Sequence, residues 1–171
     1  FNHNFKILPD MFEIWMKILK KVKNSVIWLL IDNETAQNNL KKILVSNDID
    51  PNRMIFAGRL PHSEHIIRLG LADLFLDTFP CNAHTTASDA LRSFLPIITI
   101  KGNSFASRVA SSLLASVGLE ELITKSDKEY EELAVKIAEN KNFFKEIKDK
   151  LKNNIIDMPL FNSKLFTKKL E

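Results

Sequence analysis

Short apolar runs alternate along the chain with longer segments in which apolar residues recur at helical spacing. That alternation is typical of β-α-β units arranged around a parallel sheet. It predicts an α/β fold, with a Rossmann-like parallel sheet flanked by helices. The apolar runs predicted to be strands are residues 25–31 (SVIWLLI), 53–58 (RMIFAG), 72–79 (ADLFLDTF) and 95–100 (LPIITI), with a shorter LITK run near Leu122.

Helices are predicted in the segments between these strands. The first runs from about Pro9 to Val22, a polar one from about Glu34 to Ser46, and another begins at about Thr85. Beyond Ser126 the pattern is wholly helical and rich in Lys and Glu, until Pro159 interrupts it. The chain has only four glycines, so a Gly-rich phosphate loop of the dinucleotide or nucleoside-triphosphate kind is absent.

Length and composition predict one soluble domain. A chain of 171 residues that is 45% hydrophobic can bury one substantial core but hardly two. Its longest apolar run, SVIWLLI, is far shorter than the about 20 residues of a membrane-spanning helix, so no membrane contact is expected. The start of the sequence has no initiator Met and no secretory leader, which predicts a piece of a longer protein that is not secreted. The single cysteine, Cys81, rules out an internal disulfide and suits a reducing compartment such as the cytoplasm.

Charge argues against nucleic acid as a partner. The net charge of +3 comes from 24 basic residues interspersed with 21 acidic ones. Such a mixture is typical of a solvated surface, whereas a protein that neutralises phosphodiesters concentrates its cations.

The segment NAHTTASDAL (residues 82–91) follows the third predicted strand. Ligands of open parallel sheets bind at the carboxyl ends of the strands. A helix start at this edge offers unpaired N–H groups and a partial positive charge, which bind phosphate without any glycine motif. His84, Thr85 and Thr86 add further donors. In the alternative interpretation Thr86 and Asp89 form a Thr-x-x-Asp variant of the capping box, and the segment is only a helix cap.

Several segments together resemble the catalytic region of the O-GlcNAc transferase family, which includes Spindly-type O-fucosyltransferases. They are LADLFLDTFPCNAHTTASDAL, which looks closest to the bacterial members, FASRVASSLL, FNHNFKI, SVIWLL, NRMIFAGRLPHSEH and PLFN, in the family's order. The resemblance covers nearly the whole chain. It implies that residues 1–171 form the C-terminal, nucleotide-sugar-binding lobe of a GT-B glycosyltransferase. An N-terminal lobe and helical TPR repeats would belong to the longer protein.

The resemblance also implies roles for particular residues. His84, Thr85 and Thr86 would hold the diphosphate of the donor, and Asp89 would contact its ribose. Lys6 matches the family's essential lysine at the leaving phosphate, and Lys6 and His84 are the implied catalytic residues. The remaining implied donor-binding residues are His3, near the same phosphate, and His62, His65 and Arg68 around the nucleoside. Animal members have a lysine at the position of His62, so the sequence departs from the family there.

The implied reaction moves N-acetylglucosamine from UDP-GlcNAc to Ser or Thr hydroxyls of protein acceptors, with inversion and without a metal or other cofactor. Catalytic groups of GT-B enzymes lie on both lobes, so this lobe alone should bind the donor without turnover. One alternative is a Spindly-like O-fucosyl or glucosyl transferase that uses another nucleotide sugar. Another is a Rossmann-like binding module that has kept the fold without the activity.

The histidines at positions 3, 62, 65 and 84 fall on segments expected to converge at one crevice. His62 and His65 have the spacing of zinc ligands, but a catalytic zinc needs three protein ligands, and no convincing acidic partner accompanies the pair. The Asp-x-Asp at Asp48 to Asp50 precedes a strand, on the wrong side of the sheet for a ligand, and is interpreted as turn chemistry. Cys81 is interpreted as a half-buried loop residue without reactivity.

Overall fold

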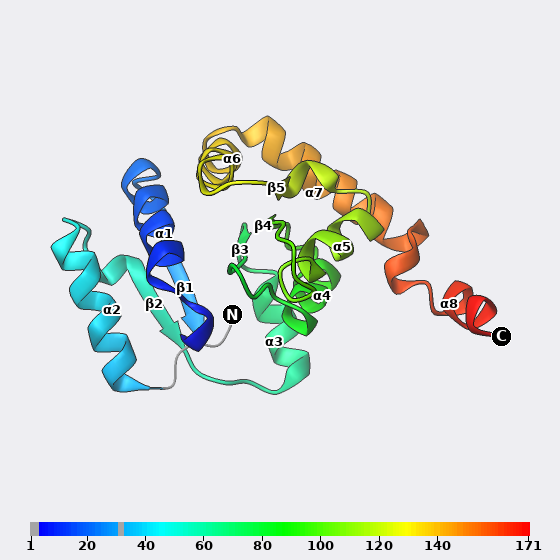
Figure 1. The fold of residues 1–171 in the computed structure, drawn as a ribbon, viewed down its shortest axis with the longest axis horizontal. Coiled ribbons are helices and arrows are strands. Elements are labelled where there is room, and N and C mark those ends of the chain that lie inside the picture. The colour runs from blue at the N-terminus through cyan, green and yellow to red at the C-terminus, as the bar shows by residue number, and fades with distance from the viewer. Residues whose placement is uncertain (1–3, 31–32) are drawn as a thin grey trace.

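The structure is a computed structural model, which describes residues 4–30 and 33–171. Its strands are all parallel and fall into two groups (Figure 1). His3, which the resemblance assigns to the donor site, lies outside the described residues.

The first group is a pair of strands with two helices. Ile27 of β1 lies opposite Met54 of β2, and Leu30 lies opposite Ala57. The elements in chain order are the 3-10 turn η1 (Asn4–Lys6), α1 (Pro9–Lys21), β1 (Ile27–Leu30), α2 (Glu34–Ser46), the 3-10 turn η2 (Pro51–Arg53) and β2 (Met54–Ala57).

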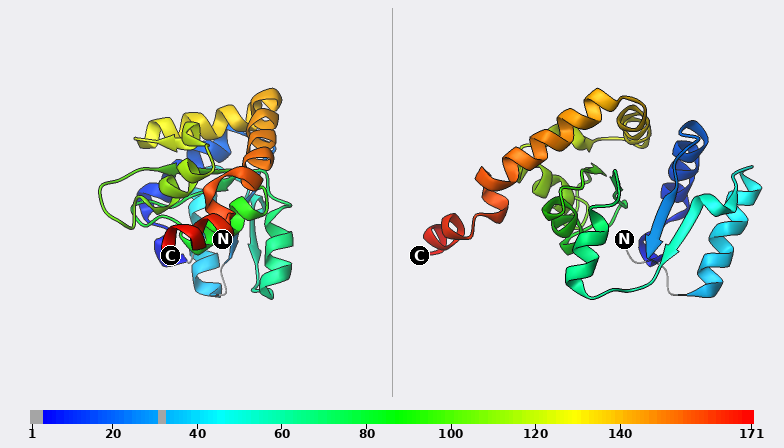
Figure 2. Two further views of the ribbon diagram at one scale, coloured as in Figure 1. Left: turned by 90° about the vertical axis from the view of Figure 1, so that its right-hand side faces the viewer. Right: turned by 180° about the vertical axis from the view of Figure 1, so that it is seen from behind.

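The second group contains three strands in the order β3-β4-β5. Its elements are α3 (His62–Leu69), β3 (Phe75–Leu76), α4 (Thr85–Arg92), β4 (Ile97–Ile100), α5 (Val109–Ser116), the turn η3 (Glu120–Leu122) and β5 (Ile123–Thr124). The chain ends in α6 (Asp127–Glu139), α7 (Lys141–Asp157), the turn η4 (Pro159–Phe161) and α8 (Ser163–Leu170). Helices α6 and α7 lie on one side of β3 and β4, and α3 and α4 lie on the other (Figures 1 and 2).

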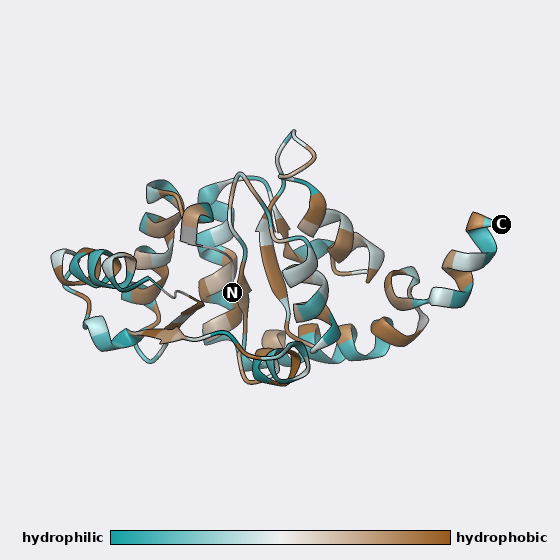
Figure 3. Ribbon diagram, turned by 90° about the horizontal axis from the view of Figure 1, so that it is seen from below, coloured by the Kyte–Doolittle hydropathy of each residue, from teal (hydrophilic) through white to brown (hydrophobic). Residues whose placement is uncertain are grey.

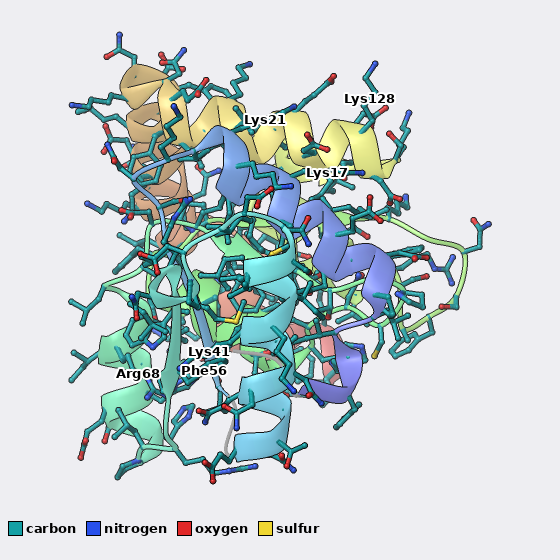
Figure 4. The ribbon with its side chains drawn as sticks, turned by 90° about the vertical axis from the view of Figure 1, so that its left-hand side faces the viewer. Lys17, Lys21, Lys41, Phe56, Arg68 and Lys128 are labelled. Carbon is teal, nitrogen blue, oxygen red and sulfur yellow. The ribbon has the colours of Figure 1, made fainter. Side chains whose placement is uncertain are left out.

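The core is built around β4, because every residue of this strand is buried. The strands are the most continuously apolar segments of the ribbon, while the helices alternate between apolar and polar positions (Figure 3). Helix α1 buries one face, from Met11 to Leu19, and packs against α6. Lys17 and Lys21 lie on the α6 side of α1 (Figure 4), where Lys21 forms an ion pair with Glu131 at 2.7 Å. No helix in the described part of the chain is both long and apolar enough to cross a membrane.

The predicted α/β fold with a parallel sheet is confirmed, and so are the starts of α1, α2 and α4. The prediction of a strand over residues 72–79 is wrong at both ends, since β3 covers only Phe75–Leu76. The backbone N–H of Asp77 still donates to Ile98 on β4, and the chain leaves the ladder after it. The helical pattern predicted beyond Ser126 is confirmed, and it forms two helices, because Asn140 ends α6 and caps α7 by accepting from the N–H of Phe143.

The prediction of turn chemistry at Asp48 to Asp50 is confirmed. Asp48 has a positive φ of 57°, a conformation in which Asp is among the more tolerant residues. The Asp50 side chain accepts from the N–H of Asn52 in η2, directly before β2. The pair therefore lies at the amino end of a strand.

Candidate functional site

The side chain of Asp77 holds the two ends of the loop between β3 and α4 together. This carboxyl is 1% exposed. Its Oδ1 accepts from the N–H groups of Thr78 at 2.8 Å and Ala83 at 2.7 Å, and its Oδ2 accepts from the Thr99 hydroxyl at 2.7 Å. The Asp77 carbonyl accepts from the buried Tyr130 hydroxyl at 2.9 Å. One residue thus links the loop to β4 and α6.

Further bonds hold the loop from within. The Thr78 hydroxyl donates to the carbonyl of Cys81 at 2.7 Å, and the Asn82 side-chain amide donates to the carbonyl of Thr78 at 3.0 Å. The N–H of Asn82 donates to Ala106, in the loop that follows β4. Cys81 is partly buried with a free thiol, as the sequence predicts for a loop residue. The loop therefore presents the start of α4 from a fixed position.

Burial raises the pKa of Asp77 from 3.8 to about 7. The hydrogen bonds from Thr99, Ala83 and Thr78, and the positive charge of Lys6, act in the opposite direction but do not offset the desolvation. A carboxyl with this pKa carries only part of its negative charge at neutral pH.

Lys6 reaches the same loop from the other end of the chain. Its Nζ donates to the carbonyl of Asn82 at 2.9 Å, so the cation lies two residues before His84. The His84 ring packs edge-on against Phe105, with ring centroids 5.9 Å apart. Its Nε2 is buried without a hydrogen-bond partner in the protein. Buried polar atoms normally have a hydrogen-bond partner. The Nε2 atom of His84 can therefore form a hydrogen bond with a group from outside this chain.

The alternative of a capping box at Thr86 and Asp89 is wrong. The residue in the N-cap position is His84, and its side chain makes no capping hydrogen bond. Thr85 and Thr86 occupy the first two positions of α4, so neither is the N-cap. The first N–H groups of a helix have no partner within the helix. The two threonine side chains therefore stand at the positive end of α4, next to His84.

The loop after β4 lies beside this helix start and contains Gly102. The N–H of Gly102 donates to the carbonyl of Ser107 at 2.9 Å. A Cβ at Gly102 would lie 2.7 Å from Cβ of Ser107 and 2.9 Å from Cε2 of Phe79. Glycine is required here because two loops approach closely.

A second cluster lies on α3. The Arg68 guanidinium contacts Nδ1 of His65 at 2.9 Å, donates to the carbonyl of Gly58 at 2.8 Å, and lies over the Trp28 ring at 5.8 Å. Burial, and then the charge of Arg68, lower the pKa of His65, which favours its neutral form.

The two clusters are joined through Asp89. Nε2 of His62, at the start of α3, lies 4.0 Å from Oδ1 of Asp89 on α4. The structure thus brings Lys6 to the loop before His84, His62 to Asp89, and His65 to Arg68. In the described part of the chain, no three or more His, Cys, Asp or Glu side chains form a group that could hold a metal ion.

Sequence reasoning missed Asp77, Gly102 and Phe105. The one available signal was the acidic residue inside the apolar run LFLDTF, because a buried acid must have partners. Nothing in the pattern indicates that Phe105 packs on a histidine 21 positions away.

Comparisons with known proteins agree with the resemblance in the sequence. The model of the family described as glycosyl transferase family 41 matches residues 1–170. A UDP-N-acetylglucosamine–peptide N-acetylglucosaminyltransferase of Caenorhabditis elegans is 34% identical over 171 residues, and a protein of Arabidopsis thaliana, named as a probable enzyme of this type, is 37% identical over 172. The chain is covered completely in both, but spans only 15% and 18% of these relatives.

A solved structure has the same fold. It is a mutant of the O-GlcNAc transferase from Thermobaculum terrenum, which is 24% identical and superposes with a TM-score of 0.92. The match covers 99% of this chain and 33% of the other.

The pKa of Asp77 predicts a pH dependence of stability. An unfolded Asp loses its proton near pH 3.8, while the folded protein holds it to about pH 7. The unfolded state therefore binds fewer protons between these values, and the free energy of unfolding falls as pH rises from about 4 to 7. Asp77→Asn cannot ionise, and its amide oxygen can still accept from Thr78 and Ala83. We expect the stability of Asp77→Asn relative to wild type to rise over this range, by at most about 4 kcal/mol.

Urea unfolding of both proteins at several pH values measures this difference, and other titrating groups cancel in the comparison. A difference that stays constant from pH 4 to 8 would show that Asp77 is ionised throughout.

The close contacts at Gly102 predict that replacing this glycine by alanine destabilises the protein more than the same replacement at Gly58. Gly102→Ala must displace Ser107 and Phe79, which should lower the free energy of unfolding by about 1–3 kcal/mol. Gly58→Ala is the matched control, because a Cβ at Gly58 meets nothing within 4 Å. Its effect should stay within about 0.5 kcal/mol. Urea unfolding checks both variants, and equal stability of the two would contradict the close approach of the loops.

Proposed function

The chain belongs to glycosyl transferase family 41, and on that premise we propose that it is the donor-binding lobe of a protein O-GlcNAc transferase. The reaction is transfer of N-acetylglucosamine from UDP-GlcNAc to Ser or Thr hydroxyls of protein acceptors, with inversion and without a metal. The observation that carries the proposal is the bond from Lys6 to the loop that presents the start of α4.

The donors that meet at this place suit a diphosphate. Lys6 supplies a full positive charge, and the start of α4 supplies N–H groups and the positive end of the helix dipole. Thr85 and Thr86 add hydroxyl donors, and His84 adds a ring nitrogen without a protein partner. The partial neutralisation of Asp77 lowers the negative charge beside them.

Departure of UDP places negative charge on its terminal phosphate. Donors fixed around that phosphate stabilise the transition state more than the ground state, because the charge grows as the bond to the sugar breaks. The bonds of Asp77 and Asn82 hold the loop in advance, so little reorganisation is needed during the reaction. In this proposal Lys6 and His84 are the catalytic residues of the lobe.

The cluster on α3 suits the nucleoside. Asp89, near His62, would accept a hydrogen bond from the ribose. His65 and Arg68 would form one wall of the base pocket, with Arg68 held by the carbonyl of Gly58 and the ring of Trp28. Neutral His65 offers a polar edge to a base without adding charge.

The rest of the enzyme lies outside this chain in the proposal. The chain spans less than a fifth of the two relatives compared above. We assign an N-terminal lobe, with the remaining catalytic groups, and TPR repeats that present protein acceptors to the longer protein. The lobe alone should bind the donor without turning it over.

Calorimetric titration with UDP tests the function directly. We expect a Kd between micromolar and millimolar, or about −4 to −8 kcal/mol, since the other lobe's contacts are absent. Binding should persist in EDTA. Undetectable binding of millimolar UDP by a folded sample would contradict the proposal, and strict dependence on Mn²⁺ would contradict its metal-free part. Preference for GDP would instead favour a Spindly-like donor.

Substitutions test whether the phosphate is bound at the start of α4. Thr85→Val with Thr86→Val removes both hydroxyls at nearly constant shape, and Lys6→Met removes the charge while keeping the stem. Each should weaken UDP binding at least tenfold, because a charge-assisted hydrogen bond contributes about 1.5–3 kcal/mol. Uridine, which has no phosphate, should bind these variants and the wild type nearly alike. Lys17→Met is the matched control, because Lys17 pairs with Glu13 on the surface of α1.

Unchanged UDP binding by the double valine variant would show that the threonine hydroxyls at the start of α4 do not bind the phosphate. An equal loss for UDP and uridine would indicate damage to the fold.

A further inference from the structure

The only tyrosine of the chain lies in the core, on α6. The side chain of Tyr130 is completely buried. Its hydroxyl donates to the backbone carbonyl of Asp77 at 2.9 Å, between residues that are 53 positions apart. A phenylalanine would fill the same space without burying a polar group. The hydroxyl therefore indicates a role for the bond to Asp77 beyond packing.

This bond lies at the point where β3 ends. The strand stops at Leu76, and the N–H of Asp77 still donates to the carbonyl of Ile98 on β4. The carbonyl of Asp77 is the next acceptor along the chain, and in a ladder that continued it would accept from a backbone N–H of the neighbouring strand. Here a side chain from α6 donates to it. Tyr130 thus holds the chain where it leaves the sheet and the loop to α4 begins.

The side chain of Asp77 carries this constraint to the far end of the loop. Its Oδ1 accepts from the N–H of Ala83 at 2.7 Å, and Ala83 directly precedes His84, the N-cap residue of α4. The backbone of Asp77 is therefore bonded to α6, and its carboxyl is bonded to the residue before the helix start. A displacement of Asp77 would move the start of α4 with it.

Helix α6 also contacts the element that carries Lys6. It packs against α1, and Glu131, the residue after Tyr130, forms an ion pair with Lys21 of α1 at 2.7 Å (Figure 4). Only two residues separate Lys6 from the start of α1. One helix therefore contacts both parts of the proposed phosphate site, namely α1 next to Lys6 and the loop that leads to α4.

The bond from Tyr130 does not depend on pH in the neutral range. A carbonyl oxygen can only accept, so the bond requires the protonated hydroxyl. Burial, and then the negative charge of Asp77, raise the pKa of Tyr130 well above its usual value. The hydroxyl therefore remains a donor at neutral and mildly alkaline pH.

We propose that Tyr130 is a positioning residue for the phosphate of the donor, because it holds the carbonyl of Asp77 and thereby sets the start of α4 relative to Lys6. Tyr130 acts through Asp77 and contacts no atom of the donor. Groups that bind a ligand tightly must be held to within about 0.5 Å by the residues behind them. The inference rests on the proposed function, in which the ligand at the start of α4 is the diphosphate of UDP.

Tyr130→Phe tests this role, with Thr124→Val as the matched control. The buried Thr124 hydroxyl also donates to a backbone carbonyl at 2.9 Å, but that carbonyl belongs to Thr99 on β4 and not to the loop. Each variant removes one buried hydroxyl bond at nearly constant shape. We expect Tyr130→Phe to weaken UDP binding at least about fivefold in calorimetric titration, and to change uridine binding less than about twofold. Thr124→Val should change neither by more than about twofold.

Two results of this titration would overturn the proposal. Tyr130→Phe could bind UDP as tightly as the wild type, which would mean that the bond does not position the site. Both variants could lose the same affinity, which would mean that any lost core bond has this effect. A wild-type protein that binds no UDP contradicts the proposed function instead, and the role of Tyr130 is then decided without a ligand.

Amide hydrogen exchange of the ligand-free wild type provides that measurement, and it also serves if Tyr130→Phe does not fold. If Tyr130 holds the loop, the N–H of Ala83 becomes free only when α6 opens as well. We expect the protection factor of Ala83 to match those of the α6 amides around Tyr130 to within about threefold, and to fall with them as urea is added. Protection of Ala83 that is at least about tenfold weaker would overturn the proposal, because the loop would then open while Tyr130 stays in place.

Discussion

The candidate site depends on one buried carboxyl group. Asp77 directly follows β3. Its carboxyl accepts from the N–H groups of Thr78 and Ala83 and from the Thr99 hydroxyl on β4, and its carbonyl accepts from the Tyr130 hydroxyl on α6. A buried acid without these partners would be strongly unfavourable. The fold therefore stabilises one conformation of the loop, and that conformation determines where α4 begins.

The same carboxyl affects the electrostatics of the proposed phosphate site. A fully charged carboxylate near the start of α4 would oppose an anion, but burial raises the pKa of Asp77 to about 7 and weakens that effect. Lys6, which bonds to the loop at Asn82, favours the charged form of Asp77. A phosphate that drew on the charge of Lys6 would lessen this influence.

Contacts of two cationic side chains, Lys6 and Arg68, bring distant segments together at the site. Lys6 and Asn82 are 76 positions apart, and their bond joins the turn before α1 to the loop after β3. Arg68 joins α3 to the carbonyl of Gly58 and the ring of Trp28. Both lie at carboxyl ends of parallel strands, where successive loops meet at one edge of the sheet. The topology therefore brings together residues that are far apart in sequence.

The sequence by itself determined the α/β class, the extent of α2, the starts of α1 and α4, and the helix start that carries His84, Thr85 and Thr86. These features can be predicted from periodicity and turn residues, because each feature depends on burial and backbone conformation within a short stretch of chain. Only the tertiary structure decided that β3 stops at Leu76, that Asp77 closes the loop, and that Phe105 packs on His84. A periodic pattern tells which positions are buried but not which distant groups they meet. The end of β3 and the surroundings of His84 depend on bonds and ring contacts across the fold, so they could not be predicted from local sequence.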